Sequence, residues 1–153
     1  MPIKVTYTTT RPSGEVRFSP NNFWKTPEVI SHVQTVYENT GKLLFTTNID
    51  LPIGGQMPKL TNIWIEYWDS QESIDQYWSD PMFTGDNELK KSYKAANNIV
   101  TTITSEEVAE SEVPTTPSMD WENNINSGKV ADTLVDYRLT APEGYVYSGP
   151  SEF

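Results

Sequence analysis

Four residues near the middle of the chain combine two indole rings with groups that can move a proton. Asn62, Trp64, Glu66 and Trp68 occupy every second position of an apolar and aromatic stretch. Side chains of a strand alternate between its faces, so these four are expected to share one face. An indole wall beside a carboxylate and an amide can hold a small aromatic compound and polarise its hydroxyl group. A carboxylate buried there must be paired or protonated, which would perturb its pKa.

The same rings also have a structural interpretation. Bulky side chains on one sheet face are expected to fill a barrel interior or a dimer interface, without any ligand. A register shift of one residue would also exchange Trp64 for Ile65. Both interpretations are kept open here. The candidate pocket residues are Trp64, Trp68 and Tyr67, and the candidate catalytic residues on this strand are Glu66 and Asn62.

The chain contains one histidine, His32, placed between Val29 and Val36 of an apolar helical stripe. A lone imidazole can serve as a general base near neutral pH. Neither a serine–histidine–acid spacing nor a second histidine for a metal accompanies it. His32 is therefore kept as a further catalytic candidate, and the alternative is a half-buried helix residue with a hydrogen-bond partner.

Composition narrows the classes of partner. Twenty-one acidic and 11 basic residues give a net charge of −10, which repels phosphate backbones and anionic lipids. The absence of cysteine excludes disulfides, thiolate catalysis and cysteine metal sites. The acidic residues lack the spacing of a calcium loop, and the glycine pair at 54–55 lacks the lysine of a phosphate loop. We therefore expect no metal, no cofactor, no nucleic acid and no membrane partner.

No targeting or membrane-spanning segment is expected. The first residues have no apolar core of a signal peptide, and no apolar run approaches the length of a membrane span. The sequence therefore predicts a soluble protein that stays in the cytoplasm or within a particle.

Hydrophobic periodicity predicts the order strand, helix, strand, strand, helix, strand within the first 108 or so residues. The expected elements are a strand within 2–12 with a short edge strand at 15–18, a helix over 26–41, strands at 42–49 and 60–68, a helix at 69–78 that resumes over 87–98, and a strand at 99–108. Strands of this kind pair side by side, with helices crossing over one face of the sheet.

Local signals mark the ends of the helices. Thr26 followed by Pro27 predicts the start of the first helix, and Gly41 predicts its end. Asp69 with Glu72 three residues later has the spacing of a capping box for the second helix. The inward stripe expected over 87–98 consists of Leu89, Tyr93 and Ala96.

The predicted fold is therefore α+β: a ferredoxin-like βαββαβ antiparallel sheet with two helices on one face. The opposite face would be bare and would carry bulky groups, either Trp64 and Trp68 or their neighbours. A bare apolar sheet face implies a partner, and two sheets packed face to face are the simplest symmetric arrangement. We therefore expect a homodimer, or a higher homo-oligomer, in which the two sheets enclose a barrel.

The chain divides into two parts by composition. Residues 1–110 form the predicted ferredoxin-like domain, and residues 111–153 form an irregular C-terminal arm rich in Ser, Thr, Asn, Glu and Pro. Scattered aromatic residues in the arm are expected to dock on a neighbour. The candidate interface residues are Trp121, Tyr137, Tyr145 and Tyr147.

The stretch "IWIEYWDSQESIDQYWSDPMF", residues 63–83, resembles the third strand and second helix of the dimeric α+β barrel superfamily, which includes antibiotic-biosynthesis monooxygenase-like proteins. The matching step after the helix is Ser79, Asp80, Pro81 and Phe83. The resemblance implies a ferredoxin-like fold and a dimer over residues 1–110. Its members include cofactor-independent oxygenases, haem-degrading enzymes and proteins with no known activity. Haem-degrading members use a histidine on the second helix, which this chain lacks, so haem is not expected.

Two functions follow. The first is a non-catalytic oligomeric binding or assembly protein, dimerising through the open sheet face with a docking C-terminal arm, as a subunit of a larger particle. The second is a cofactor-independent monooxygenase-like or isomerase-like enzyme that acts on a small aromatic compound inside the barrel. The second needs a cavity of roughly 300 Å³ beside the indole wall.

Overall fold

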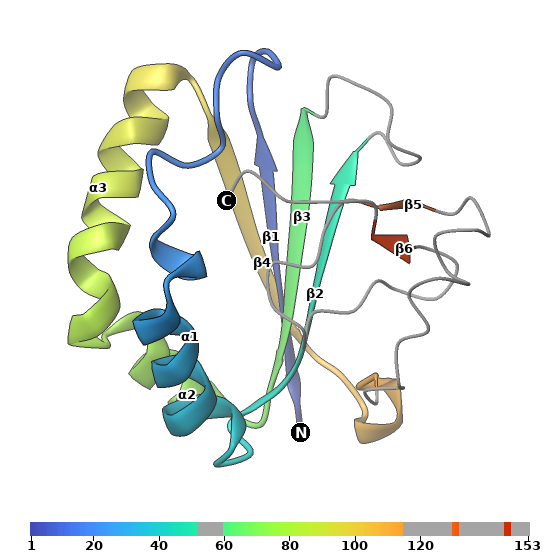
Figure 1. Ribbon diagram of the computed structural model, residues 1–153. Coiled ribbons are helices and arrows are strands. Elements are labelled where there is room, and N and C mark those ends of the chain that lie inside the picture. The colour runs from blue at the N-terminus through green and yellow to red at the C-terminus, as the bar shows by residue number, and fades with distance from the viewer. Residues whose placement is uncertain (52–59, 115–129, 132–145, 148–153) are drawn as a thin grey trace.

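A computed structural model of the chain describes residues 1–51, 60–114, 130–131 and 146–147. Four strands and three helices make up the main body (Figure 1): β1 (Ile3–Thr10), α1 (Pro27–Val33), β2 (Leu43–Leu51), β3 (Thr61–Trp68), α2 (Gln71–Trp78), α3 (Pro81–Asn97) and β4 (Val100–Glu107). One π-helical turn, Gln34–Glu38, continues α1, and 3-10 turns lie at Phe23–Lys25 and Glu110–Glu112. Two short strands, β5 (Val130–Ala131) and β6 (Val146–Tyr147), pair in parallel beside β2.

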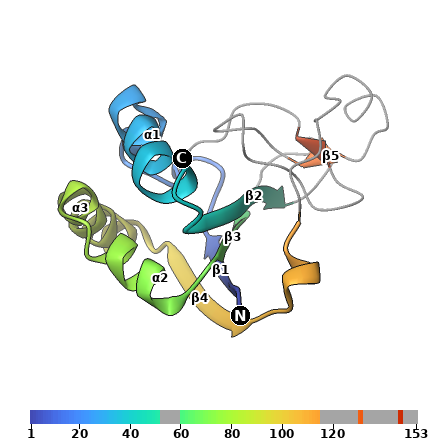
Figure 2. The ribbon, with the colours of Figure 1, turned by 90° about the horizontal axis from the view of Figure 1, so that it is seen from below.

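The four main strands form one antiparallel sheet in the order β2-β3-β1-β4. The helices lie on one face of this sheet, which both views show plainly (Figures 1 and 2). With the consecutive helices α2 and α3 counted as one helical connection, the order is βαββαβ, which is the ferredoxin-like arrangement. The predicted fold class is confirmed, and no helix in the described part of the chain is long and apolar enough to cross a membrane.

The predicted edge strand at 15–18 is wrong, because residues 14–18 form turns and bends. Arg11 is buried and donates from Nη1 to the carbonyl oxygen of Val16 at 2.9 Å. Its guanidinium also lies 4.4 Å from the ring centre of Phe18. These contacts fold the segment back on the end of β1, so its backbone does not extend along a sheet edge.

The helix starts are partly as predicted. Thr26 and Pro27 begin α1, and Gly41, with φ of +75°, closes the turn after it in the left-handed region that favours glycine. Asp69 does not begin α2, however. The cap is Ser70, whose hydroxyl accepts from the N–H of Ser73 at 3.2 Å, since the N–H of Asp69 is held by the carbonyl of Lys42.

Helix α3 starts earlier and turns differently than predicted. Asp80 caps it by accepting from the N–H of Met82 at 2.9 Å, and Pro81 occupies its first position. The expected inward stripe is wrong, because Leu89 is 51% exposed and Ala96 is exposed. Phe83 and Asp86 are the buried residues of the helix. The helix therefore turns a largely charged stripe toward the rest of the molecule.

Two apolar clusters lie on the two sides of the sheet. The larger one fills the space between sheet and helices: Ile3, Val5, Val29, Tyr37, Leu43, Trp68, Ile74 and Phe83. On the other face, Phe45 and Tyr67 pack with Val108, and Ile65 with Val113 adds to them. Part of the face predicted to be bare is thus covered by the chain's own residues that follow β4.

Candidate active site around Glu66

Strand pairing fixes which side chains share the helix-facing side of the sheet. Glu66 on β3 lies opposite Val5, and Trp68 lies opposite Ile3, both of which are core residues beneath the helices. Trp64, Glu66 and Trp68 therefore project into the helix-covered layer, and their predicted common face is confirmed. Of the two alternatives given for the open face, the one with the two tryptophans is wrong, and their neighbours Ile65 and Tyr67 lie there instead.

The carboxyl group of Glu66 is the buried acid of this layer, with 2% of the residue exposed. The indole Nε1 of Trp64 donates to its Oε2 at 3.1 Å, and the indole Nε1 of Trp68 donates to its Oε1 at 3.3 Å. The hydroxyls of Tyr7 and Tyr77 lie near the same carboxyl group and, like the two indoles, act to lower its pKa. An acid with four aromatic donors can be held ionised in a place that water does not reach.

Burial nevertheless raises the pKa of Glu66 above its ordinary value of 4.5, and the two indoles and two tyrosine hydroxyls around it only oppose this effect. Removing the carboxylate from water penalises its charged form. Burial and the charge of Glu66 together raise the pKa of the Tyr7 and Tyr77 hydroxyls, so both remain protonated donors. This upward direction of the pKa is the one expected of a buried carboxyl group at this position.

Tyr7 connects this acid to the surface. Its hydroxyl accepts a hydrogen bond from the indole Nε1 of Trp78 at 3.0 Å. Because an indole N–H only donates, the hydroxyl hydrogen of Tyr7 is left to point toward Glu66. Tyr7 is half-buried and Trp78 is 45% exposed, so this pair of side chains extends from the sheet face of Glu66 to the molecular surface.

Aromatic rings fill the space on the other side of Glu66. The rings of Trp68 and Tyr77 lie 4.8 Å apart between centres, and Tyr37 meets both of them edge-on at 5.7 and 5.2 Å. Trp68 and Tyr37 are fully buried. This packing holds the indole and hydroxyl donors of Glu66 in fixed positions.

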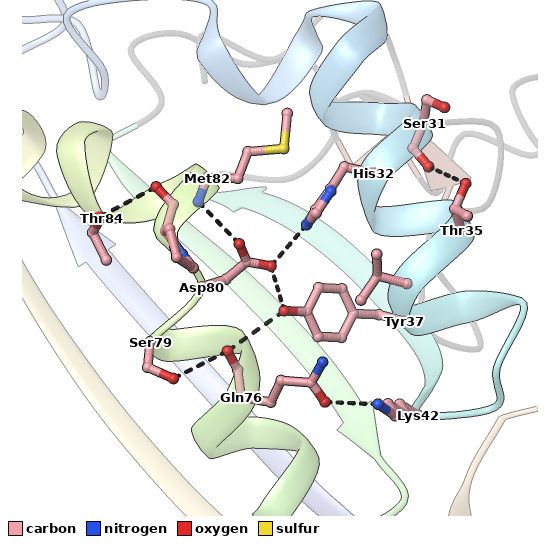
Figure 3. Close-up of polar contacts among 12 residues, drawn as sticks. Ser31, His32, Thr35, Tyr37, Lys42, Gln76, Ser79, Asp80, Met82 and Thr84 are labelled. Atoms are coloured by element: carbon pink, nitrogen blue, oxygen red, sulfur yellow. Dashed lines mark hydrogen bonds and ion pairs between the residues drawn. The ribbon is translucent and has the colours of Figure 1, made fainter.

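A second polar group ties the helices together beyond Tyr37. Nε2 of His32 lies 2.7 Å from Oδ2 of Asp80, and the hydroxyl of Tyr37 donates to the same oxygen at 2.5 Å (Figure 3). His32 comes from α1, and Asp80 is the cap of α3. The histidine is thus a partly exposed helix residue with a hydrogen-bonded partner, which agrees with the structural alternative given for it.

Asp80→Ala is expected to lower the free energy of unfolding by about 2–4 kcal/mol at pH 7, through loss of a helix cap and two charge-assisted hydrogen bonds. Burial raises the pKa of Asp80, but bonds from Tyr37, His32 and Met82 outweigh it and hold the pKa below its ordinary value. Because the pKa of Asp80 is lower in the folded protein, its ionised form stabilises the fold above the unfolded pKa of about 3.9. This stabilisation is lost as pH falls through the folded pKa.

Urea unfolding at pH 7 and pH 3 measures this effect, with the exposed Asp75→Ala as the matched control. The difference between wild type and Asp80→Ala should shrink at the lower pH, whereas Asp75→Ala should cost little at either pH. An equal loss for Asp80→Ala at both pH values would contradict an ionised Asp80 as the stabilising form.

The structure separates some of the predicted site residues. Tyr67 lies on the opposite face from Trp64 and Trp68, where it packs with Phe45 at 6.2 Å between ring centres. Asn62 is fully buried on the same side as Glu66, opposite Thr9 of β1. Of the predicted interface residues, Trp121, Tyr137 and Tyr145 lie outside the described residues, and Tyr147 belongs to β6.

Two residues of the site were missed in the sequence: Tyr7 and Tyr77. Tyr7 shares the period-two pattern of Ile3 and Val5, and Tyr77 follows Ile74 at helical spacing, so each was interpretable as core. Their hydroxyls are the only sign of a polar role. Recognising this role requires the strand register, which places the hydroxyls next to Glu66 and which sequence alone does not supply.

An open hollow of about 540 Å³ lies elsewhere, near the N-terminus. It is lined by Met1, Pro2, Leu44, Asp69, Glu110, Val113 and Pro114. Neither Glu66 nor the candidate pocket residues line it, so this hollow is not the cavity of roughly 300 Å³ beside the indole wall that the enzyme hypothesis requires. Among the described residues, no group of three or more His, Asp or Glu side chains is placed to hold a metal ion.

Known proteins resemble the chain only distantly. The sequence matches no protein-family model and no curated protein. Among solved structures, the chain is similar to SnoaB, a cofactor-independent oxygenase from Streptomyces nogalater, with 9% identity and a TM-score of 0.42 over 71% of this chain and 94% of that one. It is also similar to a dimeric ferredoxin-like protein from an uncultured marine organism, with 12% identity and a TM-score of 0.40 over 71% and 97% of the two chains.

A proposed antibiotic biosynthesis monooxygenase from Deinococcus radiodurans shows 14% identity and a TM-score of 0.41, over 70% of this chain and 93% of that one. The fold assignment rests on this chain's own strand order.

Proposed function

We propose that the chain is an enzyme that moves a proton on a small aromatic compound, with Glu66 as the base and Tyr7 as the relay. The observation that carries the proposal is the buried Glu66 carboxyl, held by the indoles of Trp64 and Trp68, on the same sheet face as Tyr7, a half-buried residue whose hydroxyl contacts Trp78. A base whose pKa is raised above 4.5 lies closer to a working pH near 7 than an ordinary carboxylate does. Core packing alone does not require an acid at this position.

The chemistry follows from the contacts. A substrate hydroxyl or acidic C–H beside Tyr7 gives its proton to the phenol oxygen while the phenol proton passes to Glu66. The substrate is left as a phenolate or enolate, Tyr7 remains a neutral phenol, and Glu66 becomes a neutral acid. Returning the proton to another carbon makes the reaction an isomerisation, whereas reaction of the enolate with dioxygen makes it an oxygenation. The proton step is common to both.

Trp78 decides access to this relay. It donates to Tyr7 from the end of α2 and is 45% exposed, so a rotation of its indole uncovers the hydroxyl without disturbing the core. The half-buried ring of Trp64, opposite Tyr7 on β3, then forms the wall against which an aromatic substrate stacks. Ile103, opposite Tyr7 on β4 and 51% exposed, forms the outer rim.

Deuterium exchange into a carbon acid tests this proposal. The probe is 2-tetralone in D₂O, since its C1 hydrogens are acidified by both a ring and a carbonyl, and proton NMR follows their loss. Wild-type protein is expected to accelerate the exchange over buffer, and Tyr7→Phe is expected to lower the rate by at least tenfold. Exchange at the buffer rate, or an unchanged rate in Tyr7→Phe, would contradict a relay through Tyr7.

The homodimer through the open sheet face, with a docking C-terminal arm, also remains a proposal. What supports it is the exposure of β4, where Val100 is 64% exposed on the open face beside the threonine-rich side of β1. Native mass spectrometry of the full chain should give a dimer, which Thr104→Arg on the open face weakens and the helix-face variant Lys91→Ala does not. A monomer at every concentration would contradict it.

A further inference from the structure

Helix α3 has three of its charged residues, Asp86, Lys90 and Lys94, on the inner side. Asp86 is 7% exposed, and the side chain of Lys90 is 14% exposed, whereas Leu89 beside them is 51% exposed. Lys94, one turn further on, is half-buried. Lysine is among the residues least often buried, and burial is costly without a paired charge. A helix that exposes a leucine and encloses two lysines is arranged for something other than core packing.

Lys90 contacts a carboxylate and an indole ring. Its Nζ lies 3.3 Å from Oδ2 of Asp86 and 5.3 Å from the ring centre of Trp24. Oδ1 of Asp86 accepts a hydrogen bond from Nδ2 of Asn21 at 2.8 Å, which ties the segment before α1 to the helix. Burial lowers the pKa of Lys90 to about 8, although the carboxylate of Asp86 opposes this effect.

Lys94 has only neutral partners among the described residues. Its Nζ donates to the hydroxyl of Thr101 at 2.9 Å, and that hydroxyl lies 3.0 Å from the hydroxyl of Thr9. Burial lowers the pKa of Lys94 as well. The cluster thus contains two ammonium groups and one carboxylate, Asp86, which pairs with Lys90 and leaves Lys94 without a described counter-charge, in a chain whose net charge is −10.

We propose that Lys94, Lys90, Thr9 and Thr101 bind the carboxylate group of a small organic acid. An anion there would supply the missing counter-charge, and the ammonium and hydroxyl groups are the donors that a carboxylate accepts. The residue types suit a small oxyanion and not a divalent cation, because the described carboxylate of the cluster is already bound to Lys90.

The position of the cluster relates it to the Glu66 site. Thr9 pairs with Thr101 and Asn62, and Tyr7 pairs with Ile103 and Trp64, so the two rows are neighbours on one face of the sheet. Residues two apart on a strand are separated by about 7 Å, which an aromatic ring and its substituents can span. This part of the inference rests on the proposed function: the acid's carboxylate would lie at Lys94 while its reacting atom lies at Tyr7.

Isothermal titration of the full-length protein with sodium benzoate and with the neutral isostere benzamide tests the site. Wild-type protein is expected to bind benzoate at least tenfold more tightly than benzamide, because only benzoate supplies the counter-charge. Lys94→Met and Lys90→Met remove the charge while keeping the aliphatic stem, and each should lose most of that preference. The control, Lys91→Met, changes an exposed lysine of the same helix and should keep it.

Equal affinity for benzoate and benzamide in the wild type, or the absence of binding by both, would overturn the proposal, as would an equal loss in Lys91→Met. Inorganic sulfate binding as tightly as benzoate would overturn the organic acid as ligand. Glu66→Gln separates the two proposals. This variant should keep the preference for benzoate while losing exchange of 2-tetralone. The anion site can therefore stand if the proton-transfer function fails, and the proton-transfer function can stand if the anion site fails.

Discussion

Replacing Glu66 by glutamine is expected to lower the rate of deuterium exchange into 2-tetralone by about 10²- to 10⁴-fold, the usual contribution of a general base. Glutamine has nearly the same shape but cannot accept a proton at neutral pH. It keeps one acceptor oxygen, so one indole N–H, of Trp64 or of Trp68, loses its partner at a cost of about 1–3 kcal/mol. The matched control is Glu72→Gln, an exposed carboxylate at the start of α2, which should leave the rate unchanged.

The stability and the exchange rate of the wild type, compared with Glu66→Gln, should depend on pH in a defined direction. Because burial raises the folded pKa of Glu66 above 4.5, the folded protein holds this proton where the unfolded chain has lost it. The contribution of Glu66 to stability is therefore full below the unfolded pKa and is lost as pH rises through the folded pKa. The exchange rate should rise over the same range, since only ionised Glu66 accepts a proton. A rate independent of pH there would contradict Glu66 as the base.

Trp68→Ala is expected to lower the free energy of unfolding by about 3–5 kcal/mol. The indole of Trp68 is fully buried, packs on Tyr77 and Tyr37, and donates to Glu66, so its removal leaves a cavity and an unsatisfied acceptor. Urea unfolding followed by circular dichroism measures the loss. This change is the largest stability effect that we expect from a single substitution in the site.

Trp78→Ala is the control for the stability loss expected of Trp68→Ala. The indole of Trp78 is 45% exposed and makes one hydrogen bond, to Tyr7, so its loss should cost about 1 kcal/mol or less. Similar losses for the two tryptophan variants would show that Trp68 does not occupy the core position described here.

The fold was predictable because local pattern and global arrangement agree. Alternation along β1 and β3, the Thr26–Pro27 start of α1 and the left-handed Asn98 after α3 each express one backbone rule in a few residues. One failure occurs where two residues compete for one role. Asp69 and Ser70 are both good caps, and a backbone hydrogen bond from Asp69 to Lys42 decides between them.

The face of the sheet to which Trp64, Glu66 and Trp68 belong was not predictable. Period-two alternation predicts that these three residues share a face, but it does not indicate which face of the sheet the helices cover. The contact between Tyr7 and Glu66 depends on pairing between strands more than 50 residues apart in the chain. The inward lysines of α3 were missed for a different reason: the amphipathic rule assigns Leu89 to the core, and this helix does not follow it.

The central claim is that Glu66 is a buried acid whose protonation is shifted upward into a useful range. Carbon-13 NMR of the glutamate side-chain carboxyl groups, titrated with pH, tests it most directly, with Glu66→Gln assigning the resonance. The account predicts a midpoint above the ordinary value of 4.5, together with a matching shift of the Tyr7 ring resonances. A midpoint at or below 4.5 would contradict it, because the four aromatic donors would then outweigh burial and leave an ordinary, permanently ionised carboxylate.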